Sequence, residues 1–170
     1  LPVCLGRATK VCDMLTDKDK TYETVLLLGT STDTQDITGR VLVTHSLDDP
    51  ELPDGAVTEE KTESCIRSFI GEYDQIPPMY SALKVGGKKL YELAREGKTI
   101  ERKSRKVMIY DIRIKDISLP RVHMEVKCSK GTYIRTLCHD IGEKLGCGGC
   151  MEKLLRTRVG QFTLDQSLKL

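Results

Sequence analysis

The order of apolar and polar positions predicts short strands mixed with short helices. Residues 21–29 contain the continuous apolar run Val25–Leu28, which indicates a strand buried on both faces. Residues 107–117 and 122–126 alternate apolar and polar side chains, as half-buried strands do, and 40–44 predict a further short strand. Between these strands, residues 30–39 predict a polar loop and 48–55 a proline-containing turn region.

The helix-period segments predict helices that each carry one apolar face. Thr58 is a suitable N-cap for a helix whose apolar stripe is Cys65, Ile66 and Phe69. Residues 88–96 and 132–145 predict two more helices, each followed by a glycine that can end it. Residues 151–158 predict a short helix or turn and 159–164 a last extended piece, whereas the prolines at 77 and 78 exclude a helix over 76–80.

These elements predict an α+β fold with a mixed, largely antiparallel sheet flanked by helices, because short links between strands outnumber βαβ units. The length of 170 residues suits one domain, or one domain with an appendage. No apolar run has the length of a membrane span, and we expect no membrane association. Seven cysteines scattered through the pattern favour reduced thiols and a cytoplasmic protein over a disulfide framework.

Charge is concentrated in one segment. The net charge is +2, but residues 84–106 carry nine basic and three acidic side chains, +6, which leaves −4 for the rest of the chain. A basic block on a nearly neutral body favours a partner that bears phosphates. A solvated, charged helix face is the ordinary alternative.

The run Lys130-Gly131-Thr132-Tyr133-Ile134-Arg135 places an arginine at the start of a predicted helix, directly after a glycine turn. A guanidinium is always charged and offers a rigid fork of donors that fits a carboxylate or a phosphate. The helix dipole disfavours a cation at this end, so a specific anionic partner for Arg135 is expected.

Several stretches, in order along the whole chain, resemble the TruB family of tRNA pseudouridine synthases. They are residues 1–10, Asp19-Lys20-Thr21-Tyr22, Thr32-Asp33-Thr34-Gln35-Asp36-Ile37-Thr38-Gly39, Pro77-Pro78-Met79-Tyr80-Ser81-Ala82-Leu83-Lys84, 87–97, 129–136 and 154–160. The resemblance implies a pseudouridine-synthase-like fold, a basic helical RNA-gripping insertion at about residues 75–106, and the T-loop uridine 55 of tRNA as target. It implies no metal or redox cofactor, the T-arm of tRNA as partner, and gives no reason to expect a protein partner.

The family's nucleophilic aspartate sits in a Gly-x-Leu-Asp-Pro loop, which by motif spacing would lie upstream of Leu1. The chain therefore looks like a partial catalytic domain, 1–170, without the N-terminal strands that carry this aspartate and without the C-terminal PUA domain. We expect this chain alone to be inactive.

Residue by residue, the resemblance assigns catalytic roles to Tyr22, Arg135 and Leu154. Tyr22 would stack on the uracil and move the C5 proton, Arg135 would hold the catalytic aspartate, and Leu154 would wall the base pocket. The ordinary readings of Tyr22 and Leu154 are a strand tyrosine at the core edge and a core leucine, and Asp33 reads best as a turn former. The substrate-binding residues that the resemblance implies are Lys10, Asp36, Tyr80, Lys84, Lys88 and Lys89. Tyr80 and Tyr91 would pack against ribose or support the helix of the insertion.

Three other readings stay open. The chain could be a tRNA-binding fragment without chemistry, or a relative that works with guide RNA, although the long basic insertion argues against the second. The sequence Cys147-Gly148-Gly149-Cys150 admits a zinc or redox site, with His139 and Cys138 near in sequence. No second CxxC completes four zinc ligands, and a glycine-rich helix stop explains the segment.

Overall fold

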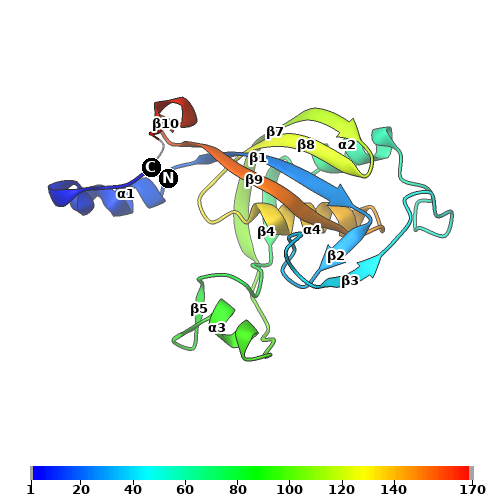
Figure 1. The fold of residues 1–170 in the computed structure, drawn as a ribbon, viewed down its shortest axis with the longest axis horizontal. Helices are drawn as coiled ribbons and strands as arrows, with labels where there is room; N and C mark the ends of the chain where they lie inside the picture. The colour runs from blue at the N-terminus through cyan, green and yellow to red at the C-terminus, as the bar shows by residue number, and fades with distance from the viewer. Residues whose placement is uncertain (1, 169–170) are drawn as a thin grey trace.

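The computed structural model describes residues 2–168 and is built on one six-stranded sheet with the order β10-β9-β1-β8-β7-β4 (Figure 1). All five strand pairings of this sheet are antiparallel. The expected α+β class with a largely antiparallel sheet is confirmed, and a parallel contribution appears as an isolated bridge between Asp36 and Met151. The strands are β1 (Lys20–Leu28), β4 (Gly71–Gln75), β7 (Arg105–Ser118), β8 (Arg121–Cys128), β9 (Gly149–Val159) and β10 (Phe162–Thr163).

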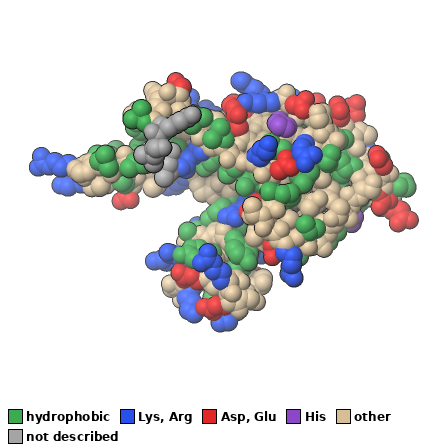
Figure 2. Space-filling model, viewed as in Figure 1, with side chains coloured by type: hydrophobic (Ala, Val, Ile, Leu, Met, Phe, Trp, Pro, Cys, Tyr) green, Lys and Arg blue, Asp and Glu red, His purple; other side chains and the backbone are tan. Residues whose placement is uncertain are grey.

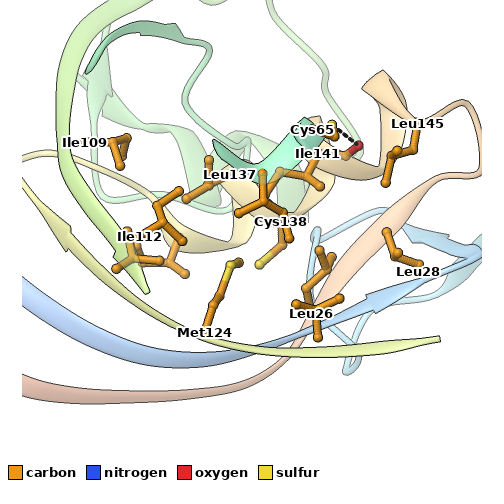
Figure 3. Close-up of a cluster of buried hydrophobic side chains, with 14 of the residues drawn as sticks. Leu26, Leu28, Cys65, Ile109, Ile112, Met124, Leu137, Cys138, Ile141 and Leu145 are labelled. Carbon is orange, nitrogen blue, oxygen red and sulfur yellow. Dashed lines mark hydrogen bonds between the residues drawn. The ribbon is translucent and has the colours of Figure 1, made fainter. Parts of the chain in front are cut away.

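Two helices cover one face of the sheet and enclose the core. These are α2 (Glu59–Arg67), capped by Thr58 as predicted, and α4 (Ile134–Lys144). Figure 3 shows side chains of β1, β7 and β8 meeting those of α4, with the Cys65 thiol donating to the Ile141 carbonyl oxygen at 3.8 Å. Leu26, Leu137 and Ile141 are fully buried there. Each such side chain stabilises the fold by about 1.5–3 kcal/mol on transfer from water.

A small hairpin follows β1. The predicted strand over 40–44 is confirmed as β3 (Val41–Thr44), but the predicted loop over 30–39 begins with β2 (Thr30–Thr32), which pairs with β3. Threonine and serine are compatible with a strand once a partner strand accepts the backbone hydrogen bonds. The pairing, which lies outside the local pattern, therefore decides the conformation of residues 30–32.

The segment predicted as an insertion projects from the main body (Figure 1). It leaves the sheet after Gln75 and returns at Arg105, and these two residues are register partners in β4 and β7. It contains β5 (Lys84–Val85), β6 (Lys88–Lys89) and α3 (Leu90–Arg95). The helix predicted over 88–96 therefore starts later, because residues 88 and 89 pair with β5.

The prediction of a helix or turn over 151–158 is wrong, because these residues belong to β9, which lies beside β1 along its whole length. Met151, Leu154 and Leu155 have helical spacing, and the surrounding residues are good helix formers. Nine paired positions with β1 override that local preference, and two register shifts remove the regular alternation that would have revealed a strand. The extended piece predicted over 159–164 is reduced to β10, and η2 (Leu164–Gln166) follows.

The N-terminal segment forms η1 (Gly6–Val11) and α1 (Cys12–Thr16), which extend away from the sheet and bury none of their residues (Figure 1). Leu1 and residues 169–170 lie outside the described residues. The expectations about upstream strands and a C-terminal PUA domain concern these two ends. None of the helices within 2–168 is long and apolar enough to cross a membrane.

Candidate active site and RNA interface

Arg135 is the second residue of α4, and the turn before it is shaped for this position. Gly131 adopts φ +80°, a conformation that side chains with a Cβ avoid. The Thr132 hydroxyl donates to the Ser129 carbonyl oxygen at 3.0 Å, and the Ser129 backbone N–H donates to Met108 of β7 at 2.9 Å. The sheet therefore holds the turn from which the arginine projects.

The Arg135 guanidinium bridges two segments that are far apart in sequence. It donates to Asp36 Oδ2 at 3.4 Å and to the carbonyl oxygen of Tyr80 at 2.5 Å. The side chains of Arg135 and Asp36 are 24% and 17% exposed. At this depth the charges are less screened than on the surface, yet solvent and ligand can still reach them. A guanidinium has five donors, and two are engaged among residues 2–168, so it can accept a further anionic partner.

Asp36 is fixed by its own loop. Its Oδ1 accepts hydrogen bonds from the Thr38 backbone N–H at 3.0 Å and from the Thr38 hydroxyl at 2.5 Å. Asp33 accepts from the Arg40 backbone N–H at 2.9 Å, a bond across seven residues that closes the loop. The Asx bond to the N–H two residues further on, which was expected of Asp33, is made by Asp36 instead. The sequence did not reveal that Asp36 pairs with Arg135, because the contact joins residues 99 positions apart.

Tyr22 lies near the start of β1, between Val126 of β8 and Arg156 of β9 in register. Its ring is half-buried and packs against the core, as the ordinary reading predicted. Burial raises the pKa of the Tyr22 phenol, and the positive charge of Arg156 offsets part of this rise. The hydroxyl is therefore protonated at neutral pH and can act as a donor. Arg156 was missed because residues 151–158 were expected to be helix or turn rather than strand.

Leu154 is paired with Thr24, two positions along β1 from Tyr22. Side chains two positions apart on a strand share a face, so Leu154 and Tyr22 belong to the same face of the sheet. The Leu154 side chain is 45% exposed, which excludes the ordinary reading of a core leucine. An exposed leucine beside a half-buried tyrosine provides apolar surface that a planar base can cover.

Two basic residues of the insertion lie close to one aromatic ring. Tyr91 has the Lys89 ammonium 5.4 Å and the Arg95 guanidinium 5.3 Å from its ring centre, and its hydroxyl accepts from Lys89 at 3.1 Å. Lys88 and Lys84 are exposed, the former 3.5 Å from Glu96. Figure 2 shows basic side chains spread over the lobe that holds β5 and α3. Cations on a projecting lobe suit contacts to a nucleic acid backbone.

Lys10 lies in η1, is exposed, and is not brought next to Arg135, Tyr22 or Leu154 by any contact among the described residues. The structure thus joins Arg135, Asp36 and Tyr80 by direct contacts and places Tyr22 and Leu154 on one sheet face. Lys84, Lys88 and Lys89 form a separate basic surface on the insertion.

The Cys147–Cys150 segment is buried, and both thiols are 0% exposed. The Cys147 thiol donates to the carbonyl oxygen of Gly148 at 3.3 Å. Within residues 2–168 no group of three or more His, Cys, Asp and Glu side chains is arranged to hold a metal. Burial also raises the pKa of Cys150 to about 11, which disfavours the thiolate that zinc binding and thiol exchange need.

Two family models match the chain. The model for the TruB family pseudouridylate synthase (N terminal domain) covers residues 1–134, and that for the tRNA pseudouridylate synthase B C-terminal domain covers residues 135–170.

The chain is similar to the tRNA pseudouridine synthase B of Alkaliphilus oremlandii, with 51% identity over 168 residues, 99% of this chain and 54% of that protein. It is 48% identical to the protein of the same name from Clostridium tetani, over all of this chain and 56% of that protein. The chain thus spans about half the length of these curated relatives.

Solved structures are similar as well. The crystal structure of a Cbf5-Nop10-Gar1 complex matches with a TM-score of 0.69 and 31% identity, over 98% of this chain and 38% of that one. The structure of an H/ACA RNP bound to a substrate RNA containing 2'-deoxyuridine matches with a TM-score of 0.62 and 25% identity, over 95% of this chain and 35% of that one.

Proposed function

The chain belongs to the TruB family of pseudouridylate synthases, and from this premise we propose that it serves in the isomerisation of uridine 55 in the T-loop of tRNA. The relatives that are about half identical carry the name tRNA pseudouridine synthase B, which supports tRNA as substrate. The Cbf5 match has lower identity, which makes the guide-RNA relative the weaker alternative.

The reaction breaks the bond between ribose C1′ and uracil N1, turns the base, and forms a bond between C1′ and C5. The C5 proton is lost and N1 gains a proton, so the product is an isomer and no electrons are exchanged with a cofactor. The protein must hold an extruded base, keep a carboxylate ionised and move one proton.

The observation that carries the proposal is the partly exposed Arg135 guanidinium, which is held by Asp36 and the Tyr80 carbonyl and still has donors to offer. An ionised carboxylate beside it would be stabilised and aimed. Tyr22 would stack on the uracil and Leu154 would wall it, since both belong to one face of the sheet. We place the nucleophilic aspartate upstream of this chain, so the chain alone would lack turnover.

The test is a chimera in which this chain replaces the matching region of the Alkaliphilus oremlandii relative. We expect the chimera to release tritium from C5 of uridine in a T-arm hairpin, and the chain by itself to release none. Replacing the target uridine with cytidine is the substrate control. A folded chimera without turnover would contradict the proposed activity.

A second candidate function is tRNA binding without chemistry, which the cations around Tyr91 favour. Filter binding of the hairpin to the chimera compares the wild type with the triple substitution Lys88→Glu, Lys89→Glu and Arg95→Glu. We expect the triple variant to bind less tightly and to show a weaker salt dependence, because phosphate contacts release counterions. Unchanged binding would remove the insertion from the RNA interface.

A further inference from the structure

Gln75, the last residue of β4, is hydrogen-bonded to the turn that precedes α4. Its side-chain Nε2 donates to the Tyr133 carbonyl oxygen at 3.0 Å, and its Oε1 accepts from the Tyr133 backbone N–H at 2.7 Å. The side chain is 1% exposed. A buried amide that satisfies both backbone groups of one residue acts like a single rung of a β-ladder.

This contact fixes the N-terminal end of α4, the helix that carries Arg135. Tyr133 is the N-cap of α4, and Arg135 follows two residues later. The neighbouring position on the same face of β4, Tyr73, donates its hydroxyl to Asp140 Oδ2 in the middle of the helix. The strand thus holds the helix at two points seven residues apart, roughly 10 Å along the axis. Two such points fix both the rotation of the helix and its position along the axis.

The same residue is the base of the insertion. Gln75 is the register partner of Arg105, and Arg102 donates to the Pro77 carbonyl oxygen at 3.1 Å, which ties the two ends of the insertion together. Tyr80, a few residues further on, accepts from Arg135. These contacts close a ring. The backbone leads from Gln75 to Tyr80, the Tyr80 carbonyl accepts from Arg135 of α4, and Tyr133 at the start of α4 is bonded back to Gln75.

We propose that Gln75 is a positioning residue for the isomerisation: its buried amide sets the first turn of α4 so that the Arg135 guanidinium meets both Asp36 and the Tyr80 carbonyl. The expected effect on turnover rests on the proposed function. The two hydrogen bonds between Gln75 and Tyr133 are observed in the structure and do not depend on it. Gln75 does not touch substrate in this scheme, and its effect passes entirely through Arg135.

The experiment uses the chimera with Gln75→Met, which keeps the size of the side chain and removes both hydrogen bonds. Displacing a group that orients the reacting atoms by about 1 Å lowers turnover on the order of 100-fold. We therefore expect kcat to fall by about that factor while the Kd for the T-arm hairpin stays within about twofold of the wild type. Gln75→Glu keeps an acceptor for the Tyr133 N–H, and because burial favours the protonated acid it keeps a weaker donor for the Tyr133 carbonyl oxygen. Its kcat should therefore lie between those of the wild type and Gln75→Met.

Thr62→Val is the matched control. Thr62 is 0% exposed and its hydroxyl donates to the Thr58 carbonyl oxygen at 2.8 Å in α2, so this variant also loses a buried hydrogen bond but leaves the arginine turn alone. A structural role for Gln75 predicts that both variants lose folded protein and that kcat per folded molecule stays at the wild-type value. That result, or a parallel loss of RNA affinity, would overturn the proposal. If Gln75→Met does not fold, Gln75→Glu decides on the same criteria.

A second readout does not depend on turnover. In the wild type we expect slow hydrogen exchange at the Tyr133 backbone amide, and in Gln75→Met fast exchange together with a shifted Arg135 guanidinium Nε–H signal. Unchanged exchange and an unchanged signal would contradict the positioning role. An inactive wild-type chimera that shows these differences would reject the proposed reaction while leaving the hold on the turn established.

Discussion

The Thr136 hydroxyl donates to the side-chain oxygen of Gln35 at 2.7 Å, directly beside the contact between Arg135 and Asp36. Two neighbouring loop residues are thus joined to two neighbouring residues at the start of α4. Gln35 has φ +64°, which is uncommon for a residue with a Cβ, and its carbonyl oxygen accepts from the Met151 backbone N–H at 3.0 Å. The surrounding contacts hold this unusual conformation and present Asp36 to the arginine.

Thr136→Val tests this junction. The hydroxyl is almost fully buried, so its loss should lower the free energy of unfolding by about 1 kcal/mol, the usual net value of one hydrogen bond. Urea unfolding measures the change. Thr157→Val, which removes a longer bond of 3.3 Å to the Thr21 carbonyl oxygen, is the matched control and should cost less. Equal losses in the free energy of unfolding would show that the bond between Thr136 and Gln35 stabilises the fold no more than the bond of Thr157 does.

Arg135→Lys tests the need for a planar fork. A lysine keeps the charge, but a single ammonium cannot meet Asp36, the Tyr80 carbonyl and a further carboxylate in one plane. We expect kcat of the chimera to fall about 100-fold or more, as when an electrostatic stabiliser of the transition state is lost. Arg113→Lys, at an exposed position of β7, is the control and should retain activity. Full activity of Arg135→Lys would show that catalysis needs only a positive charge at this position and not the planar guanidinium.

Asp140 should make stability depend on pH. Burial raises the pKa of its carboxyl above the usual 3.8, and the bond from the Tyr73 hydroxyl offsets part of the rise. The folded state therefore binds the proton more tightly than the unfolded state, so the free energy of unfolding falls as pH rises from the usual to the raised pKa. Asp140→Asn keeps an acceptor for Tyr73 and removes the titration.

Urea unfolding at a series of pH values checks this expectation. The stability of the wild type minus that of Asp140→Asn should decrease as pH rises through the window above 3.8 and become constant beyond it. Asp111→Asn, at an exposed position of β7, serves as the comparison. A difference that grows with pH would mean that the folded state favours the ionised carboxylate.

The cysteines should fall into two classes of reactivity. Cys12 is exposed and Cys4 is partly exposed, whereas the other five are buried, and burial raises the pKa of Cys138 to about 12 and that of Cys128 to about 11. A thiol-specific disulfide reagent at pH 8 should titrate two thiols before unfolding and the rest only after it, because the reagent reaches only Cys4 and Cys12 in the folded protein. Cys4 raises the pKa of Cys12, so Cys12 should react more slowly than a free thiol. Rapid reaction of Cys147 or Cys150 would reopen the redox reading of that segment.

The sequence alone determined much of this protein. Hydrophobic period and end signals placed β1, α2, β7, β8 and α4, because in these segments local preference and burial agree. The motif order identified the family that the comparisons confirm. These features depend on residues that are near one another in the chain, where the pattern itself carries the information.

The tertiary structure decided the rest. β9 is a strand despite its helical spacing, since its backbone groups pair with β1, which lies more than a hundred residues earlier. The partner of Arg135 is Asp36, and its turn is held by Gln75 through bonds that span 58 residues. Such contacts exist only after the sheet has formed, because hydrogen bonds and ion pairs depend on distances of a few ångströms that no local pattern specifies.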